Sequence, residues 1–395
     1  MNLAISLPLT LLILLFSVTG CDRNGTASAP EVTLVDSNAT KETRGLFINL
    51  DRIRHDHVLF GHQDALAYGV HWINEPGRSD VKEVTGSYPA VYGWELGDLE
   101  LGAVKNLDNV NFESMREWIR EGYKRGGVIT LSWHMNNPVS GGNAWDTHPA
   151  VQHVIPGGEH HEKFKGWLDI FADFVKNLTA SGTQWDENEH LIPVIFRPYH
   201  EQSGNWFWWG DPYCSHEDYI QLWQFTVEYL RDVKGVHNIL YAYSPHSLSE
   251  YDNDQYWDWY PGDEYIDILG FDDYFTLQSG YGFADGVSAF TEHLEWLVEQ
   301  SEARGKIPAL TEAGLEALPD PTWWTNKLLT ALKNDPTASR IAYVLVWRNA
   351  HHETDRQDHF YAPYPGHKSS DDFITFRNDP IILFEDDLPV MYHIP

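Results

Sequence analysis

The chain has 395 residues, of which 58 are acidic and only 27 are basic, which gives a formal net charge of −31 at pH 7. A surface this acidic excludes nucleic acid, whose phosphates require a basic surface, and it disfavours an anionic substrate, so a neutral partner is expected. Aromatic residues make up 14% of the chain, including 17 Trp, enough for a large core and an aromatic-lined groove. The length allows two domains, but a single (β/α)8 barrel with insertions also fits it.

The N-terminal segment resembles a bacterial lipoprotein signal. Residues 3–18 are almost wholly apolar and lead into a lipobox-like sequence, VTGC, whose Cys21 would become the lipid-modified first residue. No Lys or Arg precedes the apolar run, so an uncleaved membrane anchor is the alternative. Three segments are therefore expected: a signal peptide (1–20), the lipidated cysteine with a polar tether (21–42), and one folded domain (43–395).

Eight short apolar runs recur along the chain, and each ends in polar or aromatic residues. The runs are rich in β-branched and aromatic residues, which is typical of buried strands. They lie at residues 58–63, 90–95, 127–134, 193–201, 238–245, 266–274, 307–312 and 341–348. Between several of them lie stretches whose apolar residues have helical spacing, at 112–125, 164–178, 219–233 and 290–303.

Strands that alternate with helices imply a parallel sheet, and eight strands suggest closure into a (β/α)8, or TIM, barrel as a single catalytic domain. The sequence contains neither a G-x-G-x-x-G fingerprint nor a P-loop, which removes the commonest open-sheet alternatives. Barrel enzymes keep their chemistry at the C-terminal ends of the strands. The polar ends of the eight runs therefore predict an active site at that end of the barrel.

Two carboxylates stand at predicted strand ends, Glu201 on the fourth strand and Glu312 on the seventh. Retaining glycoside hydrolysis requires two carboxyl groups about 5–5.5 Å apart, one a nucleophile and the other an acid that later acts as a base. Arg197 and Tyr274 are candidate donors that would keep Glu312 ionised. The tryptophans that follow Glu201 would provide apolar cover for a carboxyl group that must keep its proton.

The sequence around Glu201 resembles the acid/base motif of glycoside hydrolase family 26, the β-mannanases. It reads RPYHE at residues 197–201 and GNWFWWG at 204–210, which is a long and specific match. The sequence LTEAG at 310–314 is similar to the nucleophile strand of that family, although this match alone would be weak. The resemblance covers residues 45–395. It implies a (β/α)8 barrel with Glu201 as acid/base and Glu312 as nucleophile.

The same resemblance implies roles for further residues that match the family's motifs. His200 and Trp206 would contact the sugar at the cleavage site. Tyr274 would donate a hydrogen bond to the nucleophile, and Arg197 would help to keep that carboxylate charged. The remaining matches are His134 near the leaving-group side, Trp347 as a sugar platform and Arg348 on the glycone side. Tyr199 is a small departure from the family pattern.

Other patterns invite a functional interpretation. The neighbouring histidines at 160–161 and 351–352 lack the spacing of a zinc motif, and the sequence DND at 252–254 lacks the pattern of a calcium loop, so no metal and no cofactor are expected. The acidic positions Glu95, Asp98 and Glu100 could form a solvated loop or a rim that contacts the sugar.

Expectations for one loop segment, one cysteine and two tryptophans follow from their positions in the chain. The segment 354–373 follows the eighth strand and is expected to shape the cleft. Cys214 would be the one thiol of the mature chain besides the lipidated cysteine, and an inert, partly buried thiol is expected. Trp208 and Trp209 could either line the groove or pack beneath it.

The sequence thus predicts a retaining β-1,4-mannan hydrolase for mannan, galactomannan, glucomannan or manno-oligosaccharides, and leaves endo and exo action open. The same barrel could instead act on β-1,3-xylan or mixed-linkage β-glucan. A non-catalytic, cell-anchored glycan-binding protein is the alternative from a different class. The expected partners are a neutral polysaccharide and, through the lipid anchor, the inner or outer membrane of a bacterial cell envelope. The protein is expected to be a monomer.

Overall fold

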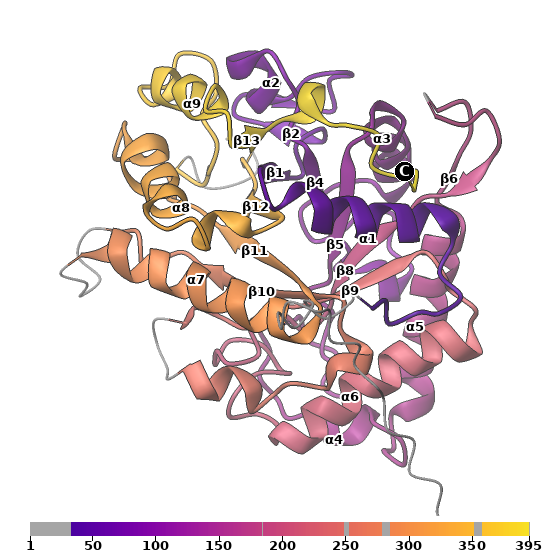
Figure 1. Cartoon of the computed structure of the whole chain (residues 1–395). Helices are drawn as coiled ribbons and strands as arrows, with labels where there is room; N and C mark the ends of the chain where they lie inside the picture. The colour runs from indigo at the N-terminus through magenta and orange to yellow at the C-terminus, as the bar shows by residue number, and fades with distance from the viewer. Residues whose placement is uncertain (1–32, 184, 249–252, 279–284, 351–357, 395) are drawn as a thin grey trace, which may run out of the picture.

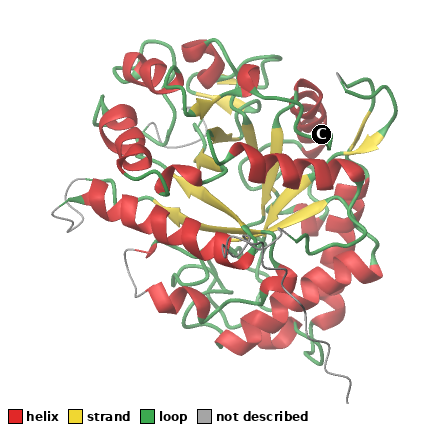
Figure 2. Ribbon diagram, in the orientation of Figure 1, coloured by secondary structure: helices red, strands yellow, loops and turns green. Residues whose placement is uncertain are grey.

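The computed structural model describes residues 33–183, 185–248, 253–278, 285–350 and 358–394. Its centre is a barrel of parallel strands surrounded by helices (Figures 1 and 2). The barrel strands are β1 (Val58–Gln63), β4 (Val91–Glu95), β5 (Val128–Ser132), β8 (Val194–Arg197), β9 (Ile239–Tyr243), β10 (Ile268–Asp273), β11 (Ile307–Ala313) and β12 (Tyr343–Val346). Neighbours in the chain are neighbours in the sheet, and β12 pairs with β1 to close it. The predicted (β/α)8 barrel is confirmed.

The barrel strands are buried along their whole length. Their inner faces fill the barrel and their outer faces lie under helices, which is why the runs are continuously apolar instead of alternating. On the outer face, Phe60 of β1 packs against the rings of Trp324, Phe373 and Phe384.

The four predicted helices are present as α3 (Phe112–Arg125), α5 (His161–Lys176), α6 (His216–Glu228) and α7 (Gly286–Arg304). The bounds of α3 match the prediction because both ends are capped. The Asn111 side chain accepts hydrogen bonds from two backbone N–H groups of the first turn, and Gly126 ends the helix with a φ of 106°. The shorter helices are α2 (Asp80–Thr85), α4 (Val151–Val154), α8 (Thr330–Asn334) and α9 (Ser370–Arg377).

Several connections depart from the regular pattern. After β9 the chain forms two 3-10 turns, η4 (Asn253–Trp257) and η5 (Asp263–Tyr265), where a barrel helix would stand. The predicted helix over 219–233 ends in a π-helical turn, η2 (Tyr229–Val233), and a second such turn, η6 (Trp324–Leu329), leads into α8. Two small antiparallel pairs, β2 (Tyr68–Gly69) with β3 (Trp72–Ile73) and β6 (Thr179–Ala180) with β7 (His190–Leu191), extend from the loops.

The first helix, α1 (Lys41–Ile53), and the residues before it pack at the N-terminal end of the barrel. The backbone N–H of Val35 donates to Asp267, and that of Thr40 donates to the carbonyl of His237. Asp267 and His237 precede the strands β10 and β9. The folded body therefore includes residues from Val35 on, so it begins before the expected boundary at residue 43.

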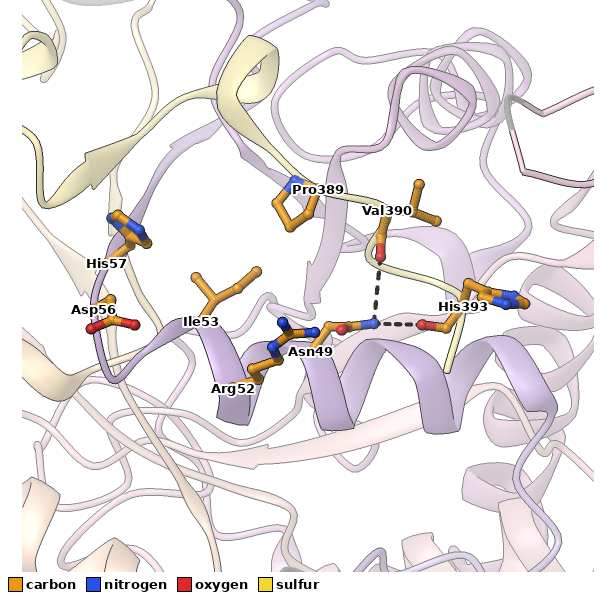
Figure 3. Close-up of a pocket in the computed structure, with 8 residues that line it drawn as sticks. All are labelled: Asn49, Arg52, Ile53, Asp56, His57, Pro389, Val390 and His393. Atoms are coloured by element: carbon orange, nitrogen blue, oxygen red, sulfur yellow. Dashed lines mark hydrogen bonds between the residues drawn. The ribbon is translucent and has the colours of Figure 1, made fainter. Parts of the chain in front are cut away.

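The C-terminal segment returns along α1. The strand β13 (Ile382–Leu383) pairs with the start of β1, and the 3-10 turn η8 (Glu385–Asp387) follows it. The Asn49 side-chain amide then donates to the carbonyls of Met391 and His393. A pocket of about 410 Å3 lies between α1 and this segment (Figure 3). Since α1 packs at the N-terminal end of the barrel, the pocket lies opposite to the polar strand ends. Within the part of the chain described, we find no helix long and apolar enough to span a membrane.

Candidate active site

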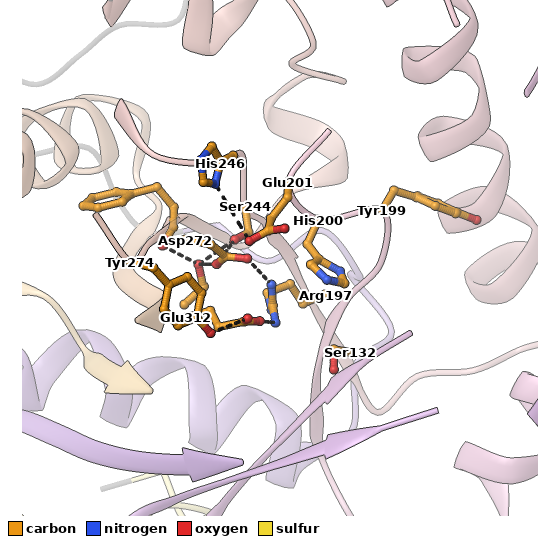
Figure 4. Close-up of polar contacts among 12 residues, drawn as sticks. Ser132, Arg197, Tyr199, His200, Glu201, Ser244, His246, Asp272, Tyr274 and Glu312 are labelled. Atoms are coloured by element: carbon orange, nitrogen blue, oxygen red, sulfur yellow. Dashed lines mark hydrogen bonds and ion pairs between the residues drawn. The ribbon is translucent and has the colours of Figure 1, made fainter. Parts of the chain in front are cut away.

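Glu201 and Glu312 lie together at the C-terminal end of the barrel (Figure 4). Glu312 belongs to β11, and Glu201 lies in the turn after β8. One carboxylate oxygen from each, with one from Asp272, lies within 4.8 Å of the others. Both glutamates are buried, with exposed fractions of 9% for Glu201 and 5% for Glu312. The two carboxylates that the sequence placed at strand ends are thus neighbours.

The turn that carries Glu201 has an unusual backbone. Tyr199 and Glu201 have positive φ values of 48° and 55°, a region that side chains other than glycine rarely adopt. The backbone N–H of Glu201 donates to the carbonyl of Ser244, which fixes the turn against the next strand. The Tyr199 hydroxyl bonds to Thr226 of α6, so its ring points away from the carboxylates (Figure 4). The departure at Tyr199 therefore concerns packing outside the site.

Glu312 accepts hydrogen bonds from both of its predicted donors. The Tyr274 hydroxyl donates over 2.6 Å, and the Arg197 guanidinium pairs with the other carboxylate oxygen. The same guanidinium also pairs with Asp272, so it lies between two carboxylates (Figure 4). Asp272 in turn accepts hydrogen bonds from the hydroxyl of Ser244. Burial and the surrounding acidic groups raise the pKa of Asp272, while Arg197 opposes that rise.

Glu201 has a different set of neighbours. The indole N–H of Trp206 donates to it over 2.7 Å, and Nδ1 of His246 lies 3.9 Å from its other oxygen. The rings of Trp206 and His246 pack edge to face with centroids 4.7 Å apart. Glu201 therefore lies in a more apolar setting than Glu312, with no guanidinium bonded to it among the described residues.

The two carboxyl groups affect each other's protonation. Burial raises the pKa of Glu312, as does the charge of Glu201, against the opposing effects of Arg197 and Tyr274. Burial also raises the pKa of Glu201, but the positive charge of His246, the hydrogen bond from Trp206 and the charge of Arg197 outweigh burial and lower that pKa. A neutral His246 would remove this charge, while the hydrogen bond from Trp206 and the charge of Arg197 would remain. Carboxylates this close resist double ionisation, so the pair can hold one proton.

His134 follows β5 and contacts both Glu95 and His200. Its Nδ1 lies 2.8 Å from the Glu95 carboxylate, and its Nε2 lies 3.2 Å from Nε2 of His200. Burial lowers the pKa of His134, but the charge and hydrogen bond of Glu95 outweigh it and raise that pKa. A doubly protonated His134 can donate to both neighbours. Burial and the charges of Arg197 and His134 keep the pKa of His200 well below its usual value, so His200 is the neutral acceptor.

Glu95 and Glu100 contradict the solvated-loop interpretation. Glu95 is fully buried and accepts hydrogen bonds from the Ser132 hydroxyl and from the backbone and ring of His134. Glu100 is buried as well and accepts a hydrogen bond from the Trp133 indole. The donors that satisfy both carboxylates include Trp133 and His134 of the segment after β5, which is more than 30 residues away in the sequence. Sequence reasoning missed Glu95 as the partner of His134.

Trp347 and Arg348 were expected on the eighth strand and directly follow its end, at Val346 of β12. The Trp347 ring approaches His134 with centroids 6.1 Å apart. The Arg348 guanidinium pairs with Asp108 over 3.1 Å and lies 5.8 Å from the centre of the Tyr68 ring. The Arg348 side chain therefore faces the loops after β1 and β4, whereas Trp347 lies beside the loop after β5.

Aromatic side chains divide into those that reach solvent at the site and those beneath it. Trp145, which the sequence did not single out, is 47% exposed and stacks on His134 with centroids 5.1 Å apart. Trp208 and Trp209 are fully buried, and their indole N–H groups donate to backbone carbonyls. These two tryptophans therefore pack beneath the site, which answers the question that the sequence left open.

The remaining sequence patterns lie apart from the carboxylates. His161 bonds to the carbonyl of Val154, whereas His160 faces Glu159. Residues 351–352 and Asp252 lie outside the described residues. Among those described, the one group with metal-ligand spacing is the Glu201, Asp272 and Glu312 cluster, where Arg197 already supplies a positive charge.

The segment 354–373 and Cys214 also have defined places where the structure describes them. Tyr361 packs against Tyr274 with ring centroids 5.5 Å apart, so this part reaches the site. Phe373 lies instead in α9 on the outer layer, so the expectation that the whole segment shapes the cleft is wrong. Cys214 is a free, half-buried thiol, as predicted, and burial raises its pKa to about 12.

The site can be compared with those of known proteins. A GH26 β-mannanase from Bacteroides ovatus superposes with a TM-score of 0.81 at 44% sequence identity, over 90% of this chain and 98% of that one. An endo-β-1,4-mannanase from Cellulomonas fimi gives the same TM-score at 36% identity, over 92% of this chain and 80% of that one.

Two sequence relatives are mannan endo-1,4-β-mannosidases. The protein from Bifidobacterium adolescentis is 38% identical over 72% of this chain, which spans only 28% of that relative's length. The protein from Bacillus subtilis strain 168 is 30% identical over 62% of this chain and 67% of the relative. The profile of glycosyl hydrolase family 26 matches residues 35–351, which include both carboxylate strands. With its barrel, its paired glutamates and this match, the chain belongs to glycosyl hydrolase family 26.

Proposed function

We propose that the protein is a retaining β-1,4-mannan hydrolase. The observation that carries this proposal is the pair Glu201 and Glu312, whose oxygens approach within 4.8 Å. Retaining enzymes place their two carboxyl groups about 5–5.5 Å apart, whereas inverting enzymes need room for a water molecule and place them about 6.5–9.5 Å apart. The mannanase names of the relatives support mannan as the substrate.

In the proposed reaction, the Glu312 carboxylate attacks the anomeric carbon of the sugar while Glu201 gives its proton to the departing glycosidic oxygen. The bond to the leaving sugar breaks as the bond to Glu312 forms. Glu201 then takes a proton from water, and that water displaces Glu312 with overall retention of configuration. Arg197 and Tyr274 favour the ionised form of Glu312, since both donate to its oxygens and oppose the rise in its pKa.

The neighbouring side chains would hold the sugar. We propose that His200 and Trp206 contact the sugar at the cleavage point and that His134 serves the leaving-group side. Trp347 would provide a platform for the sugar ring, and Arg348 would bind hydroxyl groups on the glycone side. The positions of these residues around the carboxylates support the assignments.

Replacement of the two glutamates tests the mechanism. Glu312→Ala should lose nearly all turnover of mannan and manno-oligosaccharides while the protein stays folded, because no nucleophile remains. Glu201→Ala should retain more activity on an aryl β-mannoside with a good leaving group than on mannan, since that substrate needs little protonation. Full activity in Glu312→Ala, or equal losses on both substrates in Glu201→Ala, would contradict the assignments.

The mode of action and the substrate range need separate measurements. We propose internal cleavage, which the names of the relatives support. Early products from mannohexaose decide this: mixed oligomers indicate endo action, and mannobiose alone indicates an enzyme that acts from a chain end. Parallel assays on β-1,3-xylan and mixed-linkage β-glucan test the alternative substrates. Saturable binding without release of reducing ends would indicate a glycan-binding protein instead.

We also propose that the protein is a monomer held on a bacterial membrane through lipid on Cys21. The lipobox-like sequence that ends at Cys21 supports this location. Cys21→Ser should move the protein from the membrane fraction to the soluble fraction, and an unchanged distribution would contradict the anchor. Light scattering of the soluble form would measure its mass.

A further inference from the structure

A buried carboxylate joins the loops that follow the first and last barrel strands. Asp80, the first residue of α2, is only 2% exposed. Its Oδ2 accepts hydrogen bonds from the backbone N–H of Val70 and from the Asn349 side-chain amide, both over 2.8 Å. Its Oδ1 accepts a hydrogen bond from the Trp72 indole over 2.7 Å. One side chain thus connects the β2–β3 hairpin to the segment after β12.

The hairpin is shaped for this contact. A Cβ atom at Gly69 would lie 2.3 Å from Oδ2 of Asp80 and 2.4 Å from the Trp72 indole nitrogen, so only glycine fits there. The preceding residue, Tyr68, is the ring that faces the Arg348 guanidinium. The approach of the hairpin to Asp80 therefore also sets the position of Tyr68.

Asn349 extends the connection into the last loop. Its Oδ1 accepts hydrogen bonds from the backbone N–H groups of Tyr361 and Ala362, and its amide donates to the Ala362 carbonyl as well as to Asp80. Every hydrogen-bonding position of this amide is used. Asn349 directly follows Arg348 in the chain, so its fixed orientation restricts the backbone from which the Arg348 side chain extends.

Joining two loops through the buried Asp80 carboxylate carries a desolvation cost. Burial raises the pKa of Asp80, and its three partners are neutral donors. An apolar contact of similar size would avoid this desolvation cost. Hydrogen bonds, unlike apolar contacts, fix direction, and a fully satisfied buried network holds its members in one arrangement.

We propose that Asp80 and Asn349 are positioning residues for substrate binding. By joining the two loops they fix the Arg348 guanidinium relative to Tyr68, and thereby set the affinity for sugar units on the glycone side. This inference rests on the sugar-binding role proposed above for Arg348. It assigns no chemical step to Asp80, which touches neither Glu201 nor Glu312.

The variant Asp80→Asn tests the proposal with almost no change in shape. Its amide NH2 must face at least one of the three donors, so the connection is lost. KM for mannopentaose should rise about five- to tenfold, whereas kcat should stay within about twofold. If Asp80 acts through Arg348, the double variant Asp80→Asn/Arg348→Ala should have a KM within about twofold of that of Arg348→Ala alone. An unchanged KM in Asp80→Asn, or increases that multiply in the double variant, would overturn the proposal.

A matched variant separates this effect from loss of stability. Asp372, in the first turn of α9, also ties two elements by accepting two hydrogen bonds from Thr325, but on the outer layer. Asp372→Asn should lower Tm and leave KM unchanged. If Asp80→Asn fails to fold, Trp72→Phe removes one donor and retains the ring, and it should show a smaller KM increase with the same non-additivity.

The activity of the unaltered protein distinguishes failure of the proposed function from failure of the positioning role. If the unaltered protein does not cleave mannan, the proposed function fails, and the variants are compared on whichever β-glycan it cleaves. If it cleaves mannan and the variants behave additively, the positioning role alone fails.

Discussion

His246 is the histidine whose positive charge acts on Glu201. Its Nδ1 lies 3.9 Å from the Glu201 carboxylate, and its positive charge lowers the pKa of Glu201. A general acid loses activity as the pH rises through its pKa. His246→Gln removes the charge and should therefore raise the pKa of Glu201, which moves the alkaline limb of the kcat/KM profile to higher pH, by about 0.5–1 unit.

The acidic limb of that profile serves as the internal control. It reports ionisation of the nucleophile, Glu312, whose side-chain donors are Arg197 and Tyr274. A shift of the alkaline limb to lower pH, or no shift, would contradict the influence of His246 on Glu201.

Glu95 provides a second test at the level of single residues. Burial raises its pKa, but His134 and the other donors outweigh burial and bring the pKa of Glu95 to about 2. A carboxyl group whose pKa is lowered on folding stabilises the protein above its unfolded pKa, and this contribution is lost as the pH falls toward about 2. Glu95→Gln should therefore lower the free energy of unfolding at pH 7 by about 2–3 kcal/mol.

The same variant should change His134. Without the negative charge of Glu95, which raises the pKa of His134, that pKa should fall. NMR titration of the ring measures this directly, and urea denaturation measures the stability. A pKa of His134 that stays raised in Glu95→Gln would show that another acidic group holds the second proton.

Some residues of the site could be assigned to it from the sequence, and others could not. Glu201 and Glu312 were predictable because each ends one of the runs, and Arg197 because it follows the apolar part of the same run as Glu201; the closed barrel brings such ends together. Glu95 also ends a run, yet its role depends on His134 of the neighbouring strand. Trp145 lies well inside a loop, where no periodicity indicates which side chain folds back onto His134. Contacts that depend on loop conformation carry no such local signal.

At the scale of elements, the contact between α1 and the C-terminal segment should contribute measurably to stability. Asn49 donates to the carbonyls of Met391 and His393. A Cβ atom at position 45 would lie only 2.7 Å from the backbone of Tyr392, so Gly45 allows the close approach of the two segments. Asn49→Ala leaves these carbonyls without their donor and should cost about 1–3 kcal/mol of the free energy of unfolding. Arg52→Ala, on the exposed face of the same helix, should change it by about 0.5 kcal/mol or less.

Urea denaturation of both variants measures the difference. Equal stabilities for Asn49→Ala and Arg52→Ala would mean that the C-terminal segment does not depend on this side chain.

The elements themselves followed the sequence where local signals agreed. The barrel strands were visible as apolar runs, and α3 carried its caps in the sequence. The 3-10 turns η4 and η5 in the described residues after β9 and the two-residue β13 were not predictable. The strand β13 exists through its pairing with the start of β1, and a pair of residues carries no periodicity.

At the scale of the whole molecule, the chain enters the barrel at the end opposite to the site. Val35 and Thr40 bond to residues that precede β10 and β9, whereas Glu201 and Glu312 lie where the strands end. An attachment before residue 33 should therefore leave the cleft open. The proposed lipid anchor would present the cleft away from the membrane surface, toward soluble glycan.

Capture on a solid support tests this orientation. A chain that starts at residue 33 and carries an N-terminal biotin should retain kcat/KM for mannan within about twofold of the free protein, since the support faces the closed end of the barrel. The comparison is a Leu101→Cys/Cys214→Ser variant captured through its new thiol. Leu101 is 60% exposed and lies in the 3-10 turn after β4, on the side of the strand ends. That support should hinder the polysaccharide far more than mannotetraose, because only a long chain must pass it. Equal losses for both capture sites would contradict the opposite placement of anchor and cleft.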